Sequence, residues 1–311
     1  MESLSLLEKV FLNYELNIFL SRLVGVIPLI VAIVGIIVDF KLAAKSKEDT
    51  GKVRLFGVLI GIVLICLIAF NVTNSFTNWF TNPDVKVEGG IYFGETTNGI
   101  ADGYGRLYYD DNHKIMYIGN FKNSDFEGKG KRFYIEKFGN NKEIVYLGYD
   151  GEHHKGYRNG KGLHYLYVNG EERLCYDGEY LLGELNGHAE QAVSYYEDGS
   201  VKSSYTGGFA YGNKYGYGTY IKYDERGNYS WRYRGVYWND LEHGKGILEY
   251  IAKSGKKDVY VGYFADGVFD GEGVIYASDG TILEEGIYEN DELKEEKDLS
   301  ESYPFPDDCI W

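Results

Sequence analysis

Two stretches near the start of the chain are apolar on every side. Leu23 to Val38 and Leu55 to Phe70 each run for 16 residues without a charge, and the flanks Asn17 to Phe19 and Asn71 to Thr73 can extend both toward membrane-spanning length. A buried helix pair in a soluble domain is the alternative, but no other part of the chain is patterned to cover two such helices. A cleaved signal peptide is disfavoured because the first run lacks a basic leader and a second run follows it. The pattern predicts two transmembrane helices in a hairpin over residues 23–80.

The first 22 residues have a helical periodicity of their own. Apolar residues recur there at spacings of three and four, at Leu4, Leu7, Phe11, Tyr14 and Ile18. This spacing predicts an amphipathic helix over residues 1–22 that lies on a membrane surface or packs between subunits.

Beyond residue 88 the pattern changes to short aromatic and β-branched runs separated by turn residues. Gly105 to Tyr109, Gly130 to Ile135 and Gly273 to Tyr276 have the composition of pleated strands. Residue pairs that adopt the positive φ angles of tight hairpin turns lie between the runs: Asn98-Gly99, Asn159-Gly160, Asn169-Gly170, Asp198-Gly199, Asp266-Gly267 and Asp279-Gly280. This part of the chain is therefore predicted to be all-β and built from antiparallel hairpins.

The hairpins belong to a sequence repeat. Seven times the chain has a tyrosine, one spacer and a glycine, with a Gly-x-Gly pair or its variant about ten residues later. The lead tyrosines, 25 to 32 residues apart, are Tyr92, Tyr117, Tyr149, Tyr176, Tyr205, Tyr233 and Tyr260. One hairpin cannot bury a face by itself, so successive hairpins are expected to stack into a single-layer β-ribbon.

This pattern resembles the MORN repeat (membrane occupation and recognition nexus), whose usual form is Tyr-x-Gly-x-x-x-x-Gly-x-x-x-Gly-x-Gly. The resemblance implies a stacked antiparallel β-hairpin ribbon over residues 88–290, with seven repeats and a half-repeat cap near Glu285 to Tyr288. Ser124 and Asp240 replace the middle glycine of two copies. Ala189 replaces the last glycine of the fourth copy, where we expect a local distortion.

The remaining residues, 291–311, form an acidic C-terminal tail that ends in aromatic residues. Two interpretations are open for it. The tail is mobile in solvent, or it docks in a groove of its own or a neighbouring ribbon or on a partner.

The second apolar run contains features of a packed or pore-lining helix. Gly57-x-x-x-Gly61 offers a small-residue face for helix packing, and a wholly apolar helix that lined a pore would gate it by dewetting. The residues assigned to the pore or to helix packing are Gly57, Ile60, Gly61, Leu64, Ile68 and Asn71.

The side of the membrane on which the repeats lie is left open. The loop from Asp39 to Arg54 has five basic and three acidic residues, and the next basic residue after the second span is Lys86. The positive-inside rule therefore places the loop in the cytoplasm and the repeats outside. The resemblance to MORN proteins implies the cytoplasmic side instead. Both alternatives describe a two-pass protein of the cell (inner) membrane.

Charge narrows the range of ligands. The formal net charge of -15 makes the chain a poor binder of double-stranded DNA. Basic residues nevertheless alternate with tyrosines between His113 and Arg173, a combination that suits a lipid headgroup, a nucleotide or a single-stranded oligonucleotide. A solvated face of the ribbon is the alternative. The candidate anion-binding residues are Lys129, Lys131, Arg132, Lys155, Arg158 and Lys161.

Signals for catalysis and for metal binding are weak. The six histidines form no metal-ligand or nucleophile pattern, and His153-His154 is expected in a solvated hairpin turn. The three cysteines provide neither a disulfide framework nor a zinc spacing. The Gly-x-Gly pairs belong to the repeat and are no nucleotide fingerprint. We therefore expect no enzyme, no cofactor and no metal site.

Two functions fit these features. In the first, several copies form a homo-oligomeric channel or pore, and the ribbon senses a ligand or partner and gates membrane depolarisation. This arrangement resembles the two-span membrane effectors of bacterial anti-phage defence. In the second, the spans are an anchor and the ribbon is a scaffold for a protein or lipid, as in junctophilin-like proteins. A simple anchor needs one span, and this favours the channel.

Overall fold

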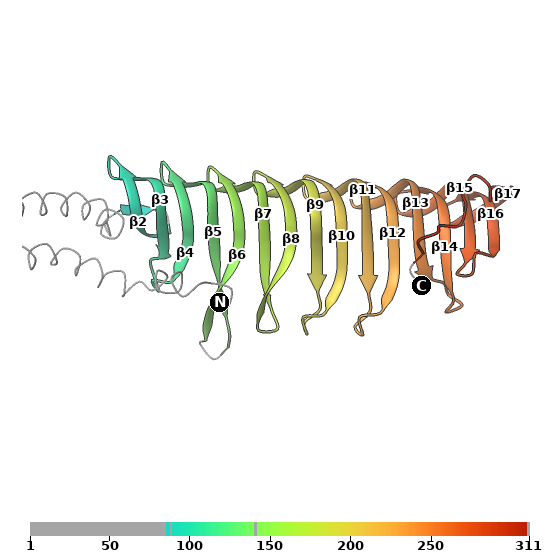
Figure 1. Cartoon of the computed structure of the whole chain (residues 1–311), viewed down its shortest axis with the longest axis horizontal. Coiled ribbons are helices and arrows are strands. Elements are labelled where there is room, and N and C mark those ends of the chain that lie inside the picture. The colour runs from blue at the N-terminus through green and yellow to red at the C-terminus, as the bar shows by residue number, and fades with distance from the viewer. Residues whose placement is uncertain (1–84, 88, 140–141, 310–311) are drawn as a thin grey trace, which may run out of the picture. The chain divides into compact units, whose positions relative to one another are not determined.

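The computed structural model describes residues 85–309 except 88 and 140–141 (Figure 1). The predicted segments 1–22 and 23–80 lie outside the described residues, and so do all six residues assigned to the pore or to helix packing. No helix among the described residues is long and apolar enough to cross a membrane. The chain divides into two compact units, Met1–Val145 and Tyr146–Trp311.

In both units the described secondary structure is entirely β-strand, and within each unit successive strands pair antiparallel. The first unit contains β1 (Val85–Val87), β2 (Gly90–Thr97), β3 (Ile100–Tyr109), β4 (Ile115–Lys122) and β5 (Asp125–Lys137). The boundary between the units falls within β6 (Glu143–His154). The second unit continues with β7 (Tyr157–Val168), β8 (Glu171–Leu181), β9 (Glu184–Tyr195), β10 (Val201–Ala210), β11 (Asn213–Tyr223), β12 (Tyr229–Trp238), β13 (Leu241–Ile251), β14 (Lys257–Ala265), β15 (Val268–Ala277), β16 (Ile282–Glu289) and β17 (Glu292–Glu296).

The predicted β-hairpins are confirmed, and one sequence repeat corresponds to one hairpin. The lead tyrosine lies in the first strand and the Gly-x-Gly pair in the second, as in β14 and β15, where Gly262 pairs with Gly273. In Figure 1 the turn within each repeat of the second unit lies at the upper edge and the connection to the next repeat at the lower edge. The half-repeat expected near Glu285 to Tyr288 lies in β16, and the sheet then continues into β17, whose residues were predicted to belong to the C-terminal tail.

The lead tyrosine explains why the repeat needs its paired glycines. The ring of Tyr260 lies across Gly262 and Gly273, and its hydroxyl donates a hydrogen bond of 2.9 Å to the carbonyl of Tyr263. A Cβ atom on Gly262 would lie 2.5 Å from that hydroxyl and 2.6 Å from the Cα of Gly273. Because backbone and ring approach so closely, any side chain at these two positions would displace the tyrosine.

A second ring, four residues after the lead tyrosine, joins neighbouring hairpins. Tyr233 meets Tyr237 of its own hairpin and Phe264 of the next one, each edge-on with ring centroids 5.0 Å apart. Tyr260 likewise contacts Phe264 at 5.1 Å and Tyr288 of the cap at 5.5 Å. Such edge-to-face contacts add to the energy of burial, so the core of the second unit is a chain of interlocked aromatic rings.

His153 takes this second-ring position in the third repeat. It is buried, and its ring lies edge-on to Tyr149 at 5.0 Å. The prediction of a solvated turn was therefore wrong for His153, while its neighbour His154 is exposed at the end of β6. This second-ring position was not identified from the sequence, because a histidine stands here where other repeats have Tyr or Phe.

Most of the predicted turns are confirmed and one is wrong. Asn98-Gly99, Asn169-Gly170 and Asp266-Gly267 all have positive φ at both residues. Asn159-Gly160 instead lies inside β7, because Lys155 and Gly156 form the turn of that hairpin with φ of 49° and 82°. A positive φ at Gly160 marks an irregularity in the strand rather than a chain reversal.

The departures from the repeat have the expected structural consequences. Ser124 and Asp240 adopt φ of 72° and 70°, the left-handed conformation otherwise supplied by glycine. The pairing of β8 with β9, which contains Ala189, has two register shifts, whereas β14 with β15 has one. The fourth repeat is therefore locally distorted without loss of the hairpin.

Candidate functional site

The sheet of the second unit has two different faces, and the C-terminal residues lie on one of them. We call the side that carries Tyr205, Tyr233 and Tyr260 the tyrosine face and the opposite side the tail face. On the tail face, Leu299 and Tyr303 are buried against Val259, Val261, Val274 and Tyr276. We call Leu299 to Cys309 the docked tail, and Figure 1 shows it crossing back over the last strands.

Backbone and ring contacts fix the middle of the docked tail. The hydroxyl of Tyr276 in β15 donates a hydrogen bond of 2.7 Å to the carbonyl of Tyr303. The ring of Phe305 lies edge-on to Tyr276, with centroids 5.4 Å apart. Of the two interpretations of the tail, the structure thus shows the docked one, in a groove of its own sheet.

Charged groups surround Tyr303. Its hydroxyl donates a hydrogen bond of 3.0 Å to Glu272, which also accepts one of 2.6 Å from Lys297. These bonds, from Lys297 first and from Tyr303 second, hold the pKa of Glu272 below its usual value. The ammonium of Lys245 lies 5.1 Å from the centre of the Tyr303 ring and 5.3 Å from that of Tyr263. The cation therefore faces aromatic rings from both the sheet and the tail.

Two arginines of β12 hold the end of the docked tail, and we call Arg232 and Arg234 the arginine pair. Arg232 donates a hydrogen bond of 2.8 Å to the carbonyl of Asp308, and Nη1 of Arg234 forms an ion pair with the Asp308 carboxylate. The hydrogen bond from Arg234 is the main cause that lowers the pKa of Asp308. Because Asp308 itself is largely exposed, this end of the tail is held by charge rather than by burial.

Glu249 of β13, a residue of the sheet itself, supplies one negative charge to the arginine pair. Its side chain is fully buried, and Oε1 accepts a hydrogen bond of 2.7 Å from Nε of Arg232 and another from Nη2. The Nη2 atom of Arg234 lies 3.5 Å from the same oxygen. One carboxylate thus faces two guanidinium groups, and Asp308 of the tail provides the second negative charge.

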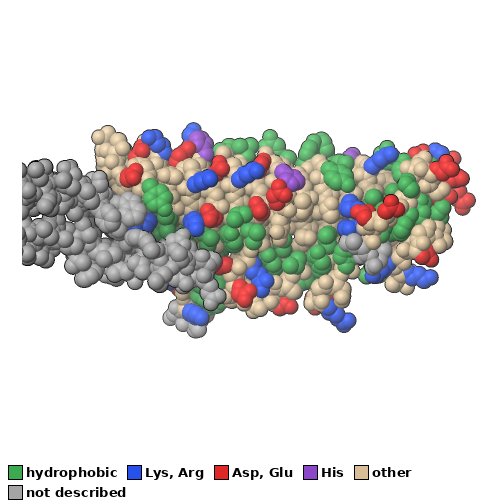
Figure 2. Space-filling model, in the orientation of Figure 1, with side chains coloured by type: hydrophobic (Ala, Val, Ile, Leu, Met, Phe, Trp, Pro, Cys, Tyr) green, Lys and Arg blue, Asp and Glu red, His purple; other side chains and the backbone are tan. Residues whose placement is uncertain are grey.

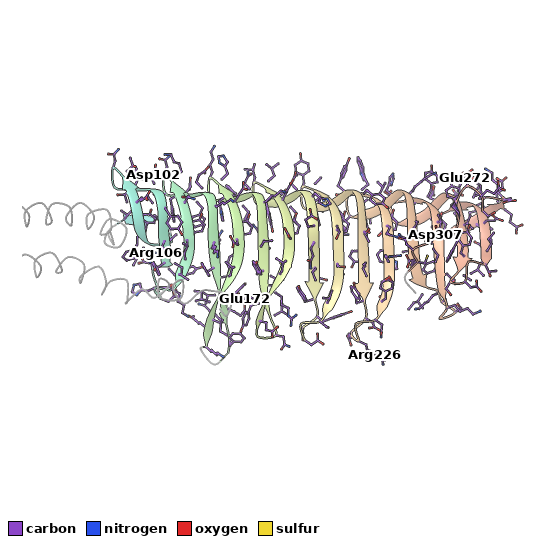
Figure 3. All side chains as sticks on the ribbon, in the orientation of Figure 1. Asp102, Arg106, Glu172, Arg226, Glu272 and Asp307 are labelled. Carbon is purple, nitrogen blue, oxygen red and sulfur yellow. The ribbon has the colours of Figure 1, made fainter. Side chains whose placement is uncertain are left out.

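A pocket of about 470 Å³ lies between the tail face and the docked tail. Arg234, Lys245 and the ring of Tyr217 line it from the sheet, and Phe305 and Asp307 line it from the tail. Figure 3 labels Asp307 where the tail crosses the strands. Tyr217 is 69% exposed, although it lies in the middle of strand β11. The pocket therefore combines two cations with aromatic and aliphatic walls and an open tyrosine ring.

A second pocket of about 470 Å³ lies on the tyrosine face and includes Lys214, Tyr220, Trp231 and Glu242. The Lys214 ammonium lies 5.1 to 5.9 Å from the ring centres of Tyr205, Tyr220 and Tyr237, and 3.4 Å from a carboxylate oxygen of Asp240. Burial raises the pKa of the nearby Glu242 carboxyl. Lys214 is already enclosed by groups of its own chain, whereas Lys222, which also lines this pocket, is exposed.

The six predicted anion-binding residues are divided between the two units. Lys129, Lys131 and Arg132 belong to β5 in the first unit, where Arg132 lies 5.7 Å from the centre of the Phe126 ring and 5.4 Å from that of Tyr134. The other three, Lys155, Arg158 and Lys161, belong to the second unit.

The three basic residues of the second unit point in different directions. Arg158 lies on the tyrosine face, 4.8 Å from the centre of the Tyr180 ring, and donates to the carbonyl of Gly183. Lys161 pairs with Glu179 next to the glycine pair, on the tail face, and Lys155 is exposed in the turn. Arg158 thus has a structural role between two hairpins, and we do not expect it to face the same ligand as Lys161.

The upper edge of the second unit carries exposed apolar side chains. Tyr211 is 77% exposed, Leu182 59% and Trp238 54%, and each lies in or beside the turn within a repeat. Figure 2 shows hydrophobic side chains gathered along this edge. An exposed apolar row of this kind is typical of a surface that contacts another molecule.

Among the described residues no group of three or more His, Cys, Asp and Glu side chains could hold a metal ion. Comparison with known protein families finds none that matches the chain, and comparison with curated proteins finds no significant match.

Proposed function

We propose that this chain is an oligomeric, channel-type membrane effector and that its MORN-type repeat sheet is the sensing part. The two apolar runs of the sequence would supply the membrane part, in a ring of several copies. One observation carries the proposal: a charged tail is docked across the sheet and ends on the arginine pair. A sensing domain needs two states, and the end of the tail, held by the hydrogen bond and the ion pair that Asp308 makes with the arginine pair, offers a second state in which that end is released.

The proposal favours a small or extended anionic signal over a large neutral one. The tail face offers Arg234 and Lys245 beside aromatic rings, and the docked tail itself is an anionic, aromatic segment. A nucleotide, an oligonucleotide or an acidic segment of a partner protein has the same chemistry. In the proposed mechanism, such a ligand displaces the tail and changes how the sheets of neighbouring copies meet.

A test measures membrane potential in cells that express the full chain, a chain ending at Lys297, or a chain without residues 92–288. We expect the chain ending at Lys297 to depolarise the membrane more than the full chain, because the docked tail holds the resting state. Leu64→Asp in the shortened chain should change the depolarisation, since Leu64 is assigned to the pore. All forms must be confirmed in the membrane fraction. An unchanged potential with every form would contradict the channel.

The alternative is a membrane-anchored scaffold that conducts no ions. The exposed row at the upper edge of the second unit, with Tyr211, Leu182 and Trp238, favours this alternative because it offers a docking surface away from the tail. If the membrane potential stays constant in all forms while Tyr211→Ser and Trp238→Ser disturb the protein's distribution along the membrane, the scaffold is supported.

A further inference from the structure

The pocket beneath the docked tail has the chemistry of a ligand site that is partly blocked by its own chain. Arg234 lines it, and within the described residues its Nε and Nη2 atoms make no hydrogen bond, although Nη2 lies near Glu249. Both atoms are buried. Guanidinium groups present several donors in one plane and suit the oxygens of a carboxylate or phosphate, so Arg234 retains unused capacity for an anion.

The charges around the pocket balance only when the tail is docked. Arg232 and Arg234 face Glu249 and Asp308, and without the tail the single carboxylate of Glu249 would remain against two guanidinium groups. Lys245 adds a third cation at the pocket wall, and Asp307 is exposed on the tail side. Release of the tail removes both aspartates and leaves a net positive pocket. The carboxylate of Asp308 therefore occupies the place of an external anion.

The uncharged residues that line the pocket indicate which group the ligand carries besides its anion. Ile247 and Val261 form an apolar floor, and the ring of Tyr217 stands exposed at the side of the pocket. An exposed tyrosine beside cations is suited to stacking with a planar ring. With the tail docked the pocket has a volume of about 470 Å³, which is already within the range of small-molecule sites, and displacement of the tail end would enlarge it.

We propose that this pocket binds a small ligand that carries a phosphate or carboxylate on a planar ring, and that the ligand anion replaces Asp308 at Arg234. Ligand binding and tail release are then one equilibrium. This proposal rests on the proposed sensing function, since it names the signal that the sheet would sense. It assigns the anion to Arg234 and Lys245 and the ring to Tyr217.

The test measures binding by calorimetry to the full chain in detergent micelles. The probes are adenosine 5′-monophosphate, adenosine, inorganic phosphate, benzoate and phenyl phosphate, which separate the ring from the charge and phosphate from carboxylate. We expect a ring with an anion to bind more tightly than the ring or the anion alone. Phenyl phosphate, measured beside benzoate because the two share one ring, shows which anion the pocket prefers.

Variants then test the competition with the tail. Asp308→Asn should tighten binding about tenfold, because it weakens the internal competitor and raises the fraction of open pockets. Tyr217→Ala and Lys245→Gln should each weaken binding, and both residues are exposed enough to be replaced without unfolding the sheet. Lys222→Gln is the matched control, since Lys222 is an exposed lysine of the same strand β11 beside the other pocket. Its binding should be unchanged.

Three results would overturn the proposal. Binding that Asp308→Asn leaves unchanged or weakens would show that the tail is no competitor. Equal losses with Lys222→Gln and Lys245→Gln would point to nonspecific charge. Tight binding of a synthetic peptide of residues 299–309 to the chain ending at Lys297, with no binding of the small probes, would assign the groove to a peptide partner instead. Binding without depolarisation would reject the proposed channel and leave the pocket assignment intact.

Discussion

Glu249 of β13 is fully buried and accepts two hydrogen bonds from Arg232, its partner directly across the hairpin in β12. A carboxylate without water is tolerated only when cations and donors satisfy it. Here one carboxylate orders both guanidinium groups of the arginine pair, because Nη2 of Arg234 also lies 3.5 Å from Oε1. The pair thereby places Arg234 where it meets the tail.

Removal of this buried charge should destabilise the second unit. We expect Glu249→Gln to lower the free energy of unfolding by about 3–5 kcal/mol, since it leaves the Arg232 charge buried without its carboxylate. The measurement is chemical denaturation followed by tyrosine and tryptophan fluorescence, with Glu197→Gln at an exposed position as the control. The double change Arg232→Met with Glu249→Leu should restore most of the loss, because apolar side chains need no partner there. A double variant no more stable than Glu249→Gln would contradict this account.

The repeat and its hairpins were predictable from the sequence because their determinants are local. A tyrosine two residues before a glycine, followed by Gly-x-Gly, fixes where the ring lies and which backbone atoms it covers, as Tyr260 does over Gly262 and Gly273. The turns could be predicted from the Asn-Gly and Asp-Gly pairs in the sequence. The turn predicted at Asn159-Gly160 was wrong because the same residue pair also fits an irregular strand. The neighbouring Lys155-Gly156 makes the turn instead.

The candidate site was harder to predict, for two reasons. The prediction groups basic residues that are close in sequence. In a strand, however, successive side chains point to opposite faces, so Arg158 and Lys161 lie on different faces of the sheet. The arginine pair lies outside that basic stretch, and its ligand Asp308 follows Arg234 by 74 residues. Of the contacts in this site, only the pairing of Arg232 with Glu249 could have been predicted from the sequence. The two residues lie opposite each other in the hairpin register that Gly235 and Gly246 set.

The glycine pairs give a second prediction about stability. Gly262→Ala should cost about 1–3 kcal/mol of folding free energy, because the new methyl group meets the Tyr260 hydroxyl and the backbone of Gly273. Gly139→Ala is the control, since no atom lies within 4 Å of the added Cβ there, and it should change stability by less than about 0.5 kcal/mol. Thermal unfolding of both variants measures the difference.

A double variant tests whether the ring is the cause. If the cost of Gly262→Ala comes from Tyr260, the cost should shrink when Tyr260→Leu is already present, and the two changes should not add. Additive losses would mean that the backbone of Gly273, and not the ring, rejects the methyl group.

His164 makes the stability of the second unit depend on pH. Burial, and secondarily the charge of Arg158, lowers the pKa of His164 from 6.5 to about 4. The ring lies opposite Tyr149, and its Nδ1 is 3.3 Å from a guanidinium nitrogen of Arg158, which favours the neutral form. Between pH 4 and 6.5 the unfolded chain therefore binds more protons at this residue than the folded sheet does. The contribution of His164 to the free energy of unfolding should rise with pH across this window, whereas the raised pKa of Glu242 gives a contribution that falls.

The contribution of His164 can be separated from that of the carboxylates. The lowered pKa values of Asp308 and Glu272 act mainly below their ordinary values of 3.8 and 4.5, and the raised pKa values of Glu242 and Asp258 act above theirs. Because these carboxylates are the same in the wild-type chain and in a His164 variant, the difference between the two pH slopes measures His164. His164→Gln should flatten the rise in denaturation midpoint between pH 4.5 and 6.5, whereas His154→Gln, at an exposed position, should preserve it. An equal slope in the wild-type chain and in His164→Gln would contradict this prediction. It would show that His164 binds a proton in the folded sheet as readily as in the unfolded chain. The buried contact between His164 and Arg158 would then have to open in mild acid.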